Sequence, residues 1–541
     1  MTRREAVAAL GAAAAGPAIL QRHDQNVARL LERQVTDPRS RWCGSALDDT
    51  GLCNPHPAGG ILESFTAAFL HPDSKFHQNP LLIERMRLAA RHLLARQNRE
   101  GNIDLVTTNF NSPPDTGFVV HNTGTAACLM KRHGLTEMFA LLEPFLRQAG
   151  AGLVRGGVHT PNHRWVVCSA LAQINDVLPH PDYVRRIDQW LAEGIDIDAD
   201  GQYSERSTLV YNIVCNRALI VTAAKLKRLE LVEPVRRNLN AMLYLLHPDD
   251  EVVTEISRRQ DLNTRGSVAS YWFALQYMAL HDNDGRFAAL ARRHEARAAS
   301  LSALMEYPEL AQPGPPDAAI PEDYERALPA LGIARIRRGL KSATLMLGGS
   351  SRFFVCRHGD AVVNAVRFAS AFFGKGQFVP QKAEKRGGAY HFEQKLEAGY
   401  YQPLDPPRRL SNDELGAARA QRKVTELCRL EQSAVVSETA RGFDLRLRSQ
   451  GTSDVPLAVE INLREGGRIE GCEPVAKKSD AWVLESGHAT YRLGRHAIRF
   501  GPGAAAHRYI DVRGAEPKLP GPSVYLTGLT PFDRTIRFEP V

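Results

Sequence analysis

The 541-residue sequence predicts two domains of different classes, an N-terminal toroid of α-helical hairpins, (α/α), followed by an antiparallel β-sandwich. Between about residues 25 and 306, apolar residues recur with the period of an α-helix, and after residue 329 they alternate with a period of two. Six prolines fall between residues 307 and 329. They prevent a regular helix there and indicate a stiff linker between a helical domain at 25–306 and a β domain at 330–541.

The helical half is clearest in the segment 81–96. Leu82, Met86 and Leu93 fall on one helical face, and Arg87 and Arg91 fall outside it. Similar apolar stripes cover 60–71, 117–132, 135–148, 163–178, 181–193, 207–228, 230–246, 267–282 and 285–305. Short joins between consecutive helices favour antiparallel hairpins, and about five or six hairpins side by side would curve into a toroid. The absence of strand–helix alternation argues against a parallel α/β sheet.

The C-terminal half has the alternating pattern of β-strands. Phe443, Leu445 and Leu447 alternate with charged residues, and the segment 457–463 also alternates. Later strands are predicted at 524–526 and 535–538. Because glycine-containing turns separate these runs, we expect antiparallel strands packed as a sandwich.

The N-terminus carries a candidate export signal. Thr2-Arg3-Arg4 precedes an alanine-rich stretch that ends at Leu20, which is typical of a twin-arginine signal over residues 1–24. An amphipathic N-terminal helix is the alternative. Export predicts a periplasmic or secreted protein and would permit a disulfide, for which Cys43 and Cys53 are the candidate pair. No apolar run approaches the roughly 20 residues of a membrane span.

Charge and composition narrow the choice of partners. Lys and Arg number 68 against 60 Asp and Glu, so the net charge of +8 suits an anionic ligand. Without a basic block or a known nucleic-acid module, we expect no nucleic-acid partner. We also expect no metal or other cofactor, because no Cys/His metal spacing is present. The Asp196-x-Asp198-x-Asp200-Gly201 run imitates a calcium loop, but Ser207 stands where that loop needs a glutamate.

Polar residues interrupt the helical pattern at several places that are candidates for chemistry. His121 and Asn122 lie among apolar neighbours in a helix, so they are either hydrogen-bonded internally or line a cavity. Asn162, His163, Arg164 and Trp165 are adjacent at a helix start. The asparagine there is either an ordinary helix cap or part of a site for an acidic sugar, in which an indole stacks on the ring and polar donors bind the carboxylate.

Two further segments are candidates in the helical half. Glu205 and Tyr211 lie where a turn leads into a helix, and Tyr211 is either a proton donor and acceptor or a core tyrosine. The charged run 258–265, which includes Arg265, is either a solvated join or a cationic wall for an acidic polymer. In the β half, His358 and His391 lie near turns.

These segments resemble the heparinase II/III-like polysaccharide lyases, which have an α/α toroid followed by an antiparallel β-sandwich. The resemblance rests on Asn162-His163-x-Trp165, on Glu205-x-Ser207 with Tyr211, and on 341–378, which is similar to the start of that group's second domain. It implies a carbon–oxygen lyase acting on an acidic polysaccharide or oligosaccharide. The segment departs from the compact Glu-x-Ser-Pro-x-Tyr-His form of the group, which leaves Tyr203 as a rival to Tyr211 for the catalytic phenol.

The resemblance also implies a mechanism. Such lyases remove the C5 proton of a uronic acid and break the O4 glycosidic bond by β-elimination, leaving an unsaturated uronate. The carboxylate beside C5 must be neutralised, for which Asn162 is the candidate, with Arg164 or Asn122. Tyr211 would protonate the leaving oxygen and act as the base in a syn elimination, and His163 would be the base in an anti elimination. The remaining candidates for substrate binding are His121, Trp165, Glu205, Tyr203, Arg265 and His391.

Two alternatives remain open. A glycoside hydrolase would need two carboxyl groups about 5–9.5 Å apart, and Asp115 and Glu205 are the candidate pair. A non-catalytic protein that binds acidic glycans would use the same aromatic and basic residues. Only the lyase makes a product with a new double bond.

Overall fold

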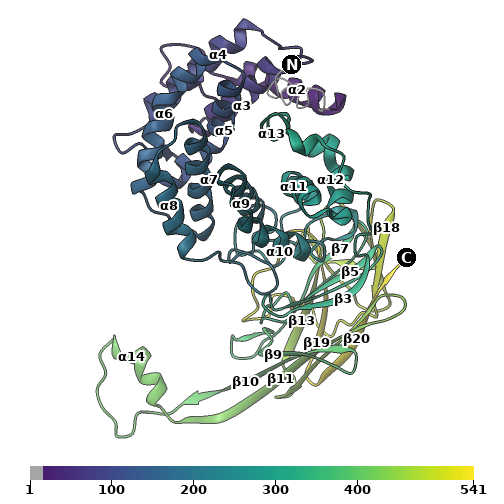
Figure 1. The fold of residues 1–541 in the computed structure, drawn as a ribbon. Helices are drawn as coiled ribbons and strands as arrows, with labels where there is room; N and C mark the ends of the chain where they lie inside the picture. The colour runs from purple at the N-terminus through teal and green to yellow at the C-terminus, as the bar shows by residue number, and fades with distance from the viewer. Residues whose placement is uncertain (1–15) are drawn as a thin grey trace. The chain divides into compact units, whose positions relative to one another are not determined.

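The chain, described by a computed structural model over residues 16–541, divides into two compact units (Figure 1). A helical unit runs to Leu246 and then from Asp250 to Pro321, and a β unit comprises His247–Asp249 and Glu322–Val541. The boundary after Pro321 falls inside the predicted linker. That prediction extends too far, because residues Asp323–Leu328 pair along their whole length with Ile333–Arg338 as an edge strand.

The helical unit consists of consecutive α-helices joined by short turns and by several longer loops. Its α-helices are α2 (Pro17–Arg33), α3 (His56–Leu70), α4 (Pro80–Arg96), α5 (Pro113–Arg132), α6 (Thr136–Arg155), α7 (Pro161–Val177), α8 (Pro181–Ala192), α9 (Tyr211–Leu226), α10 (Glu233–Met242), α11 (Trp272–Asp282), α12 (Gly285–Ala298) and α13 (Leu301–Glu306). A small hairpin pairs β1 (Ile103–Leu105) with β2 (Asn109–Ser112). Several helices begin at a proline. Proline is tolerated in the first turn because the N–H groups there have no acceptor within the helix.

The helices form two layers along an arc (Figure 1). Helices α3, α5, α7 and α9 contact one another in succession, and α4, α6, α8 and α10 pack against them. Helix α13 returns to α3 and α5. The burial agrees with this arrangement, because α7 is buried around most of its circumference, whereas only Tyr183 and Ile187 of α8 are buried. The predicted toroid of helical hairpins is confirmed.

The β unit contains two sheets. Its strands are β3 (Asp323–Leu328), β4 (Ile333–Arg338), β5 (Lys341–Met346), β6 (Phe354–His358), β7 (Ala361–Ser370), β8 (Gly376–Gln377), β9 (Lys382–Arg386), β10 (Ala389–Tyr401), β11 (Val424–Glu438), β12 (Phe443–Gly451), β13 (Pro456–Leu463), β14 (Arg468–Glu470), β15 (Glu473–Pro474), β16 (Ala481–Val483), β17 (Ala489–Leu493), β18 (His496–Gly501), β19 (Ser523–Leu529) and β20 (Phe532–Pro540). One sheet has the order β14-β17-β18-β20-β12-β11-β10-β9, and the other has the order β15-β16-β19-β13-β7-β6-β5-β4-β3.

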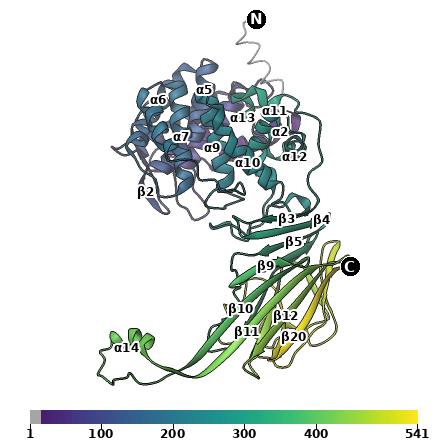
Figure 2. The same cartoon turned by 60° about the horizontal axis from the view of Figure 1, so that its bottom comes forward.

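Aromatic and aliphatic residues of both sheets form a shared core. Phe354 of one sheet packs edge-to-face against Phe443 and Phe538 of the other. All the pairings are antiparallel except that of β16 with β19. The predicted antiparallel β-sandwich is therefore confirmed. Figure 2 shows that β10 and β11 continue beyond the sheet as a long hairpin, with the short helix α14 (Glu414–Ala417) at its tip.

The start of helix α2 bears on the export prediction. Residues 1–15 lie outside the described part of the chain. Ile19 is buried, and the buried carboxylate of Asp24 accepts hydrogen bonds from the Ser74 hydroxyl at 2.6 Å and the Lys75 backbone N–H at 3.0 Å. Helix α2 therefore begins inside the predicted signal segment, 1–24, and Ile19 and Asp24 of that segment pack into the helical unit.

The predicted disulfide between Cys43 and Cys53 is wrong, because both residues are free thiols in the structure. Within residues 16–541, no helix has the length and apolar character required to cross a bilayer.

Candidate active site

The loop 257–261 lies against the start of α9. Gln260 Nε2 donates a hydrogen bond to the Tyr211 hydroxyl at 3.1 Å, and the guanidinium carbon of Arg259 lies 5.0 Å from the centre of the Tyr211 ring. Hydrogen bonding to Tyr211 is the main reason why the pKa of Arg259 is raised. Two segments distant in the sequence are thus brought together around one phenol that is only partly buried.

A buried carboxylate fixes this loop. Asp261 accepts hydrogen bonds from the Ser207 hydroxyl at 2.9 Å and the Leu209 backbone N–H at 3.0 Å, and from the hydroxyl of Ser257. Asp261 is 2% exposed, so these bonds are shielded from water. The carboxylate therefore joins the Arg259 loop to the turn that precedes Tyr211.

Glu205 connects the Asn162 segment to the same loop. Its Oε2 accepts a hydrogen bond from Asn162 Nδ2 at 2.5 Å, and its Oε1 lies 3.4 Å from Arg259 Nε. Burial raises the pKa of Glu205, against the opposing effects of Asn162 and Arg259. A continuous polar chain therefore runs from Asn162 through Glu205 and Arg259 to Tyr211.

Asn162 is almost fully buried, and its amide nitrogen is already engaged. Besides Glu205, the nitrogen donates to the Thr160 hydroxyl at 3.1 Å. The amide oxygen is buried and has no hydrogen-bond partner within the described residues. Both amide hydrogens of Asn162 are therefore used inside the protein, whereas the guanidinium of Arg259 is partly exposed.

His163 lies in an aromatic environment beside this chain. Its ring packs edge-to-face on His159 at 4.7 Å and on Phe118 at 6.0 Å between ring centres. Burial, with smaller contributions from His159 and Arg259, lowers its pKa to about 4, and Asp115 opposes the shift. The ring is therefore neutral near pH 7, and its Nδ1 is buried without a hydrogen-bond partner among the residues described.

Asp115 is the centre of a separate buried group. Its Oδ2 accepts from the Ser112 hydroxyl at 2.5 Å and from Asn109 Nδ2 at 2.9 Å, and His56 Nε2 lies 3.9 Å from Oδ1. The helix cap of α5 is Ser112, whose hydroxyl accepts from the Asp115 backbone N–H. Asp115 thus stabilises the start of α5. Glu205, the other carboxylate of the candidate hydrolase pair, instead contacts Asn162 and Arg259.

Trp165 and Arg164, in the Asn162 segment, are engaged by other residues of the protein. Trp165 has no exposed surface, and its Nε1 donates to Asp196 at 2.9 Å. Arg164 lies over the Trp165 ring and forms ion pairs with Asp196 at 3.1 Å and Glu193 at 3.2 Å. The prediction that Trp165 stacks on a sugar is wrong, because packing covers the whole indole, and Arg164 is neutralised by its acidic partners.

The structure argues against Tyr203 as the alternative to Tyr211 for the catalytic phenol. It is 2% exposed, its hydroxyl donates to Asn216 Oδ1 at 2.8 Å, and burial raises its pKa. A phenol that is fully enclosed cannot reach a polymer. Arg265 is exposed and forms an ion pair with Glu251 at 3.3 Å.

His121 and Asn122 differ in their surroundings. His121 is buried with its Nε2 hydrogen-bonded to the Ser169 hydroxyl, and burial lowers its pKa to about 3. Asn122 is partly buried and lies against α3, where its side chain is close to Gly59 and Gly60. His121 is therefore an internally bonded histidine, one of the two possibilities that the sequence left open.

Solved structures of similar fold give the architecture a context. No protein-family model and no curated protein sequence matches the chain. Chondroitin AC lyase from Streptomyces coelicolor, in complex with chondroitin sulphate, aligns with 99% of this chain and 82% of its own, with a TM-score of 0.56 and 14% identity. A heparinase III aligns with 97% of this chain over 85% of its own length, with a TM-score of 0.55 and 12% identity. A Paenibacillus xanthan lyase aligns with 97% of this chain over 57% of its own length, with a TM-score of 0.53 and 9% identity. The fold is that of the polysaccharide lyases.

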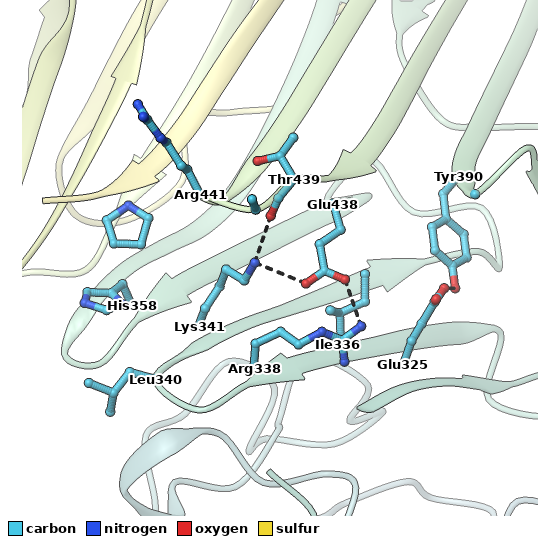
Figure 3. Close-up of a pocket in the computed structure, with 13 residues that line it drawn as sticks. Glu325, Ile336, Arg338, Leu340, Lys341, His358, Tyr390, Glu438, Thr439 and Arg441 are labelled. Atoms are coloured by element: carbon cyan, nitrogen blue, oxygen red, sulfur yellow. Dashed lines mark hydrogen bonds and ion pairs between the residues drawn. The ribbon is translucent and has the colours of Figure 1, made fainter. Parts of the chain in front are cut away.

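The β unit of this lyase fold has a cavity of about 730 Å³ (Figure 3). In its lining, the carboxylate of Glu438 forms ion pairs with Arg338 at 2.9 Å and with Lys341 at 3.1 Å. His358 lines the cavity, and burial lowers its pKa. His391 is absent from the lining, because Tyr390 faces the cavity and the next residue of β10 points to the opposite face of the sheet.

Sequence analysis includes Arg259, Gln260 and Asp261 in a candidate cationic wall but does not predict their contacts with Tyr211 and the turn before it. They belong to the charged run 258–265, whose composition is also that of a solvated join. The contact with Tyr211 is an exposed hydrogen bond between two distant segments, which no local pattern reveals. No group of three or more His, Cys, Asp or Glu side chains within residues 16–541 is arranged to hold a metal ion.

Proposed function

We propose that the chain is a polysaccharide lyase that cleaves a uronic-acid-containing glycan by β-elimination. The observation that carries the proposal is the grouping of a partly exposed phenol, Tyr211, with the guanidinium of Arg259, in contact through Glu205 with Asn162. The fold supports it, because the similar structures are lyases of acidic polysaccharides. The net charge of +8 agrees with a polyanionic substrate.

Arg259 would hold the carboxylate of the uronate. Removal of the C5 proton places negative charge on that carboxyl group, and a planar guanidinium can donate two parallel hydrogen bonds to it. Glu205 takes only part of the Arg259 charge, because its carboxylate accepts a hydrogen bond from Asn162 at 2.5 Å and lies 3.4 Å from Arg259 Nε. Asn162 and Glu205 are then positioning residues, which orient the guanidinium toward the substrate.

Tyr211 would transfer the protons. Its hydroxyl accepts from Gln260, which leaves its own hydrogen available for the O4 leaving group. The pKa of His163, near 4, makes this ring a weak base for a carbon acid, which favours Tyr211 as the base as well. We therefore propose a syn elimination in which the deprotonated oxygen of Tyr211 removes the C5 proton, and the phenol so formed donates that proton to O4 on the same face of the sugar.

We also propose that the protein acts outside the cytoplasm, on the strength of the paired arginines and alanine-rich stretch at its N-terminus. A polymer that is too large to cross a membrane must be cleaved on the side where it occurs.

The test is a product assay on a panel of acidic glycans, with chondroitin, heparan sulfate and xanthan as the first members. A lyase generates ultraviolet absorbance from the unsaturated uronate as each bond breaks. Tyr211→Phe should reduce this rate by about 10²–10⁴-fold, because the proton-transferring group is lost. Tyr277→Phe, which removes the hydroxyl of a partly buried tyrosine on α11, should retain the parent rate.

The outcomes separate the three possible functions. New reducing ends without absorbance would identify a hydrolase and refute the lyase. Binding of glycans without any cleavage would identify a binding protein. Full activity in Tyr211→Phe would remove the phenol from the mechanism.

A further inference from the structure

A second cavity lies within the helical unit. It has a volume of about 480 Å³ and is lined by residues of α3, α9, α12 and α13 and by the segment 269–274 at the start of α11. Its lining includes two arginines, Arg217 and Arg297, and one acid, Glu63. The size is within the range of pockets that bind small molecules and is sufficient for a sugar residue.

Arg217 is the distinctive member of this lining. It is partly buried, and it makes no hydrogen bond or ion pair with any residue of the described chain; its guanidinium carbon lies 5.9 Å from the centre of the Phe273 ring. The other arginine differs, because Arg297 Nη2 donates to the Ser267 hydroxyl at 2.9 Å and lies 3.0 Å from His294 Nδ1. A partly desolvated guanidinium whose hydrogen-bond donors are unused is suited to binding an anion.

Glu63 lies near Arg217 but forms no ion pair with it. Its carboxylate accepts a hydrogen bond from the Ser302 hydroxyl. Burial raises the pKa of Glu63, and nearby Glu306 raises it further, while Arg217 and Ser302 oppose the shift. The carboxyl group of Glu63 can exchange hydrogen bonds with sugar hydroxyls.

The cavity is connected to the Tyr211 site through shared elements. Helix α9 begins at Tyr211 and carries Arg217 less than two turns later. Tyr271, in the cavity lining, donates a hydrogen bond to the backbone carbonyl of Thr208, in the turn before Tyr211. Trp272 and Phe273 add aromatic surface, which suits the apolar face of a sugar ring.

We propose that this cavity binds a second sugar acid of the glycan, with Arg217 holding its carboxylate and Glu63 contacting its hydroxyls. The inference rests on the proposed function for the identity of the glycan. It makes Arg217 a specificity-determining residue, which selects a chain that carries a carboxylate beyond the one at the cleavage point.

Calorimetry with the full chain tests this inference, using Tyr211→Phe as the background so that turnover does not interfere. The probes are an unsulfated chondroitin tetrasaccharide and its carboxyl-reduced analogue. Arg217→Gln should weaken binding of the carboxylated probe at least tenfold and leave binding of the reduced probe unchanged. Arg217→Lys, which keeps the charge and loses the planar fork, should bind with intermediate affinity. Arg185→Gln, on the exposed face of α8, is the matched control for loss of one positive charge and should bind like its parent.

Parent-like binding of the carboxylated probe by Arg217→Gln would overturn the inference. An equal loss for both probes would do so too, because it would indicate a structural role for Arg217, as would failure of the parent to bind the carboxylated probe. The elimination assay on the unsubstituted chain is a separate readout. If no double bond forms but binding depends on Arg217 and the carboxylate, the proposed lyase fails and this site stands; if elimination proceeds and Arg217→Gln binds normally, only this site fails.

Discussion

At the scale of single residues, the site depends on one guanidinium with two partners. Arg259 contacts the phenol of Tyr211 and the carboxylate of Glu205. Its neighbour Arg258 is exposed and contacts the same turn through its backbone N–H, which donates to the Glu205 carbonyl at 3.2 Å. The two arginines are adjacent in the sequence, and we expect very different consequences when each is replaced.

Arg259→Gln should lower kcat by about 10²–10³-fold, the usual cost of losing one donor to a developing negative charge. Arg259→Lys should recover only part of the loss, because an ammonium lacks the planar fork. Steady-state kinetics on the best glycan of the panel measure both. Arg258→Gln is the control and should change kcat by less than about threefold, as expected for an exposed side chain. A similar loss in both variants would contradict the specific role of Arg259.

Buried histidines also make stability depend on pH. Burial lowers the pKa of His92 to about 4 from 6.5, so the unfolded chain binds the proton more readily than the folded chain. This contribution to stability is complete above pH 6.5 and is lost as the pH falls toward 4. His92→Gln should reduce the loss of unfolding free energy between pH 7 and pH 4 by on the order of 3 kcal/mol. Urea unfolding of parent and variant at both pH values measures it, and identical losses would contradict the assignment.

At the scale of elements, the helices follow from apolar periodicity, and most predicted segments correspond to a single helix. The segment 285–305 divides in two because the Ser300 hydroxyl accepts a hydrogen bond from the Ala303 backbone N–H and starts a new helix. The Asn162 and Tyr211 segments were identified as candidates because polar groups interrupt the pattern there. Their mutual contact through Glu205 and Arg259, and the enclosure of Trp165, depend on tertiary packing that periodicity does not encode.

The hydrogen bonds that Asp261 accepts hold the whole loop 257–261 in place. Asp261→Ala should release the loop 257–261 and leave the hydroxyls of Ser207 and Ser257 without their partner, at a cost of about 1–3 kcal/mol in unfolding free energy. Because Arg259 and Gln260 move with the loop, we also expect at least a tenfold loss of kcat. Thermal unfolding and kinetics together test this. Normal kinetics despite the lost stability would show that the loop is positioned by other contacts.

At the scale of the whole molecule, the change from a helical to an alternating pattern correctly predicts two units of different class. The exact limits of the linker and of the N-terminal segment were less predictable, because Asp323–Leu328 and Pro17–Asp24 acquire their structure by pairing and packing. The long β10–β11 hairpin has no counterpart in the predicted strands of the β half.

Digestion of an active glycan in water enriched in oxygen-18, followed by mass spectrometry of the fragments, tests the central claim most directly. An elimination breaks the O4 bond without adding water, so we predict unlabelled fragments of which one carries an unsaturated uronate. Incorporation of one heavy oxygen per cleaved bond would show hydrolysis and contradict the account.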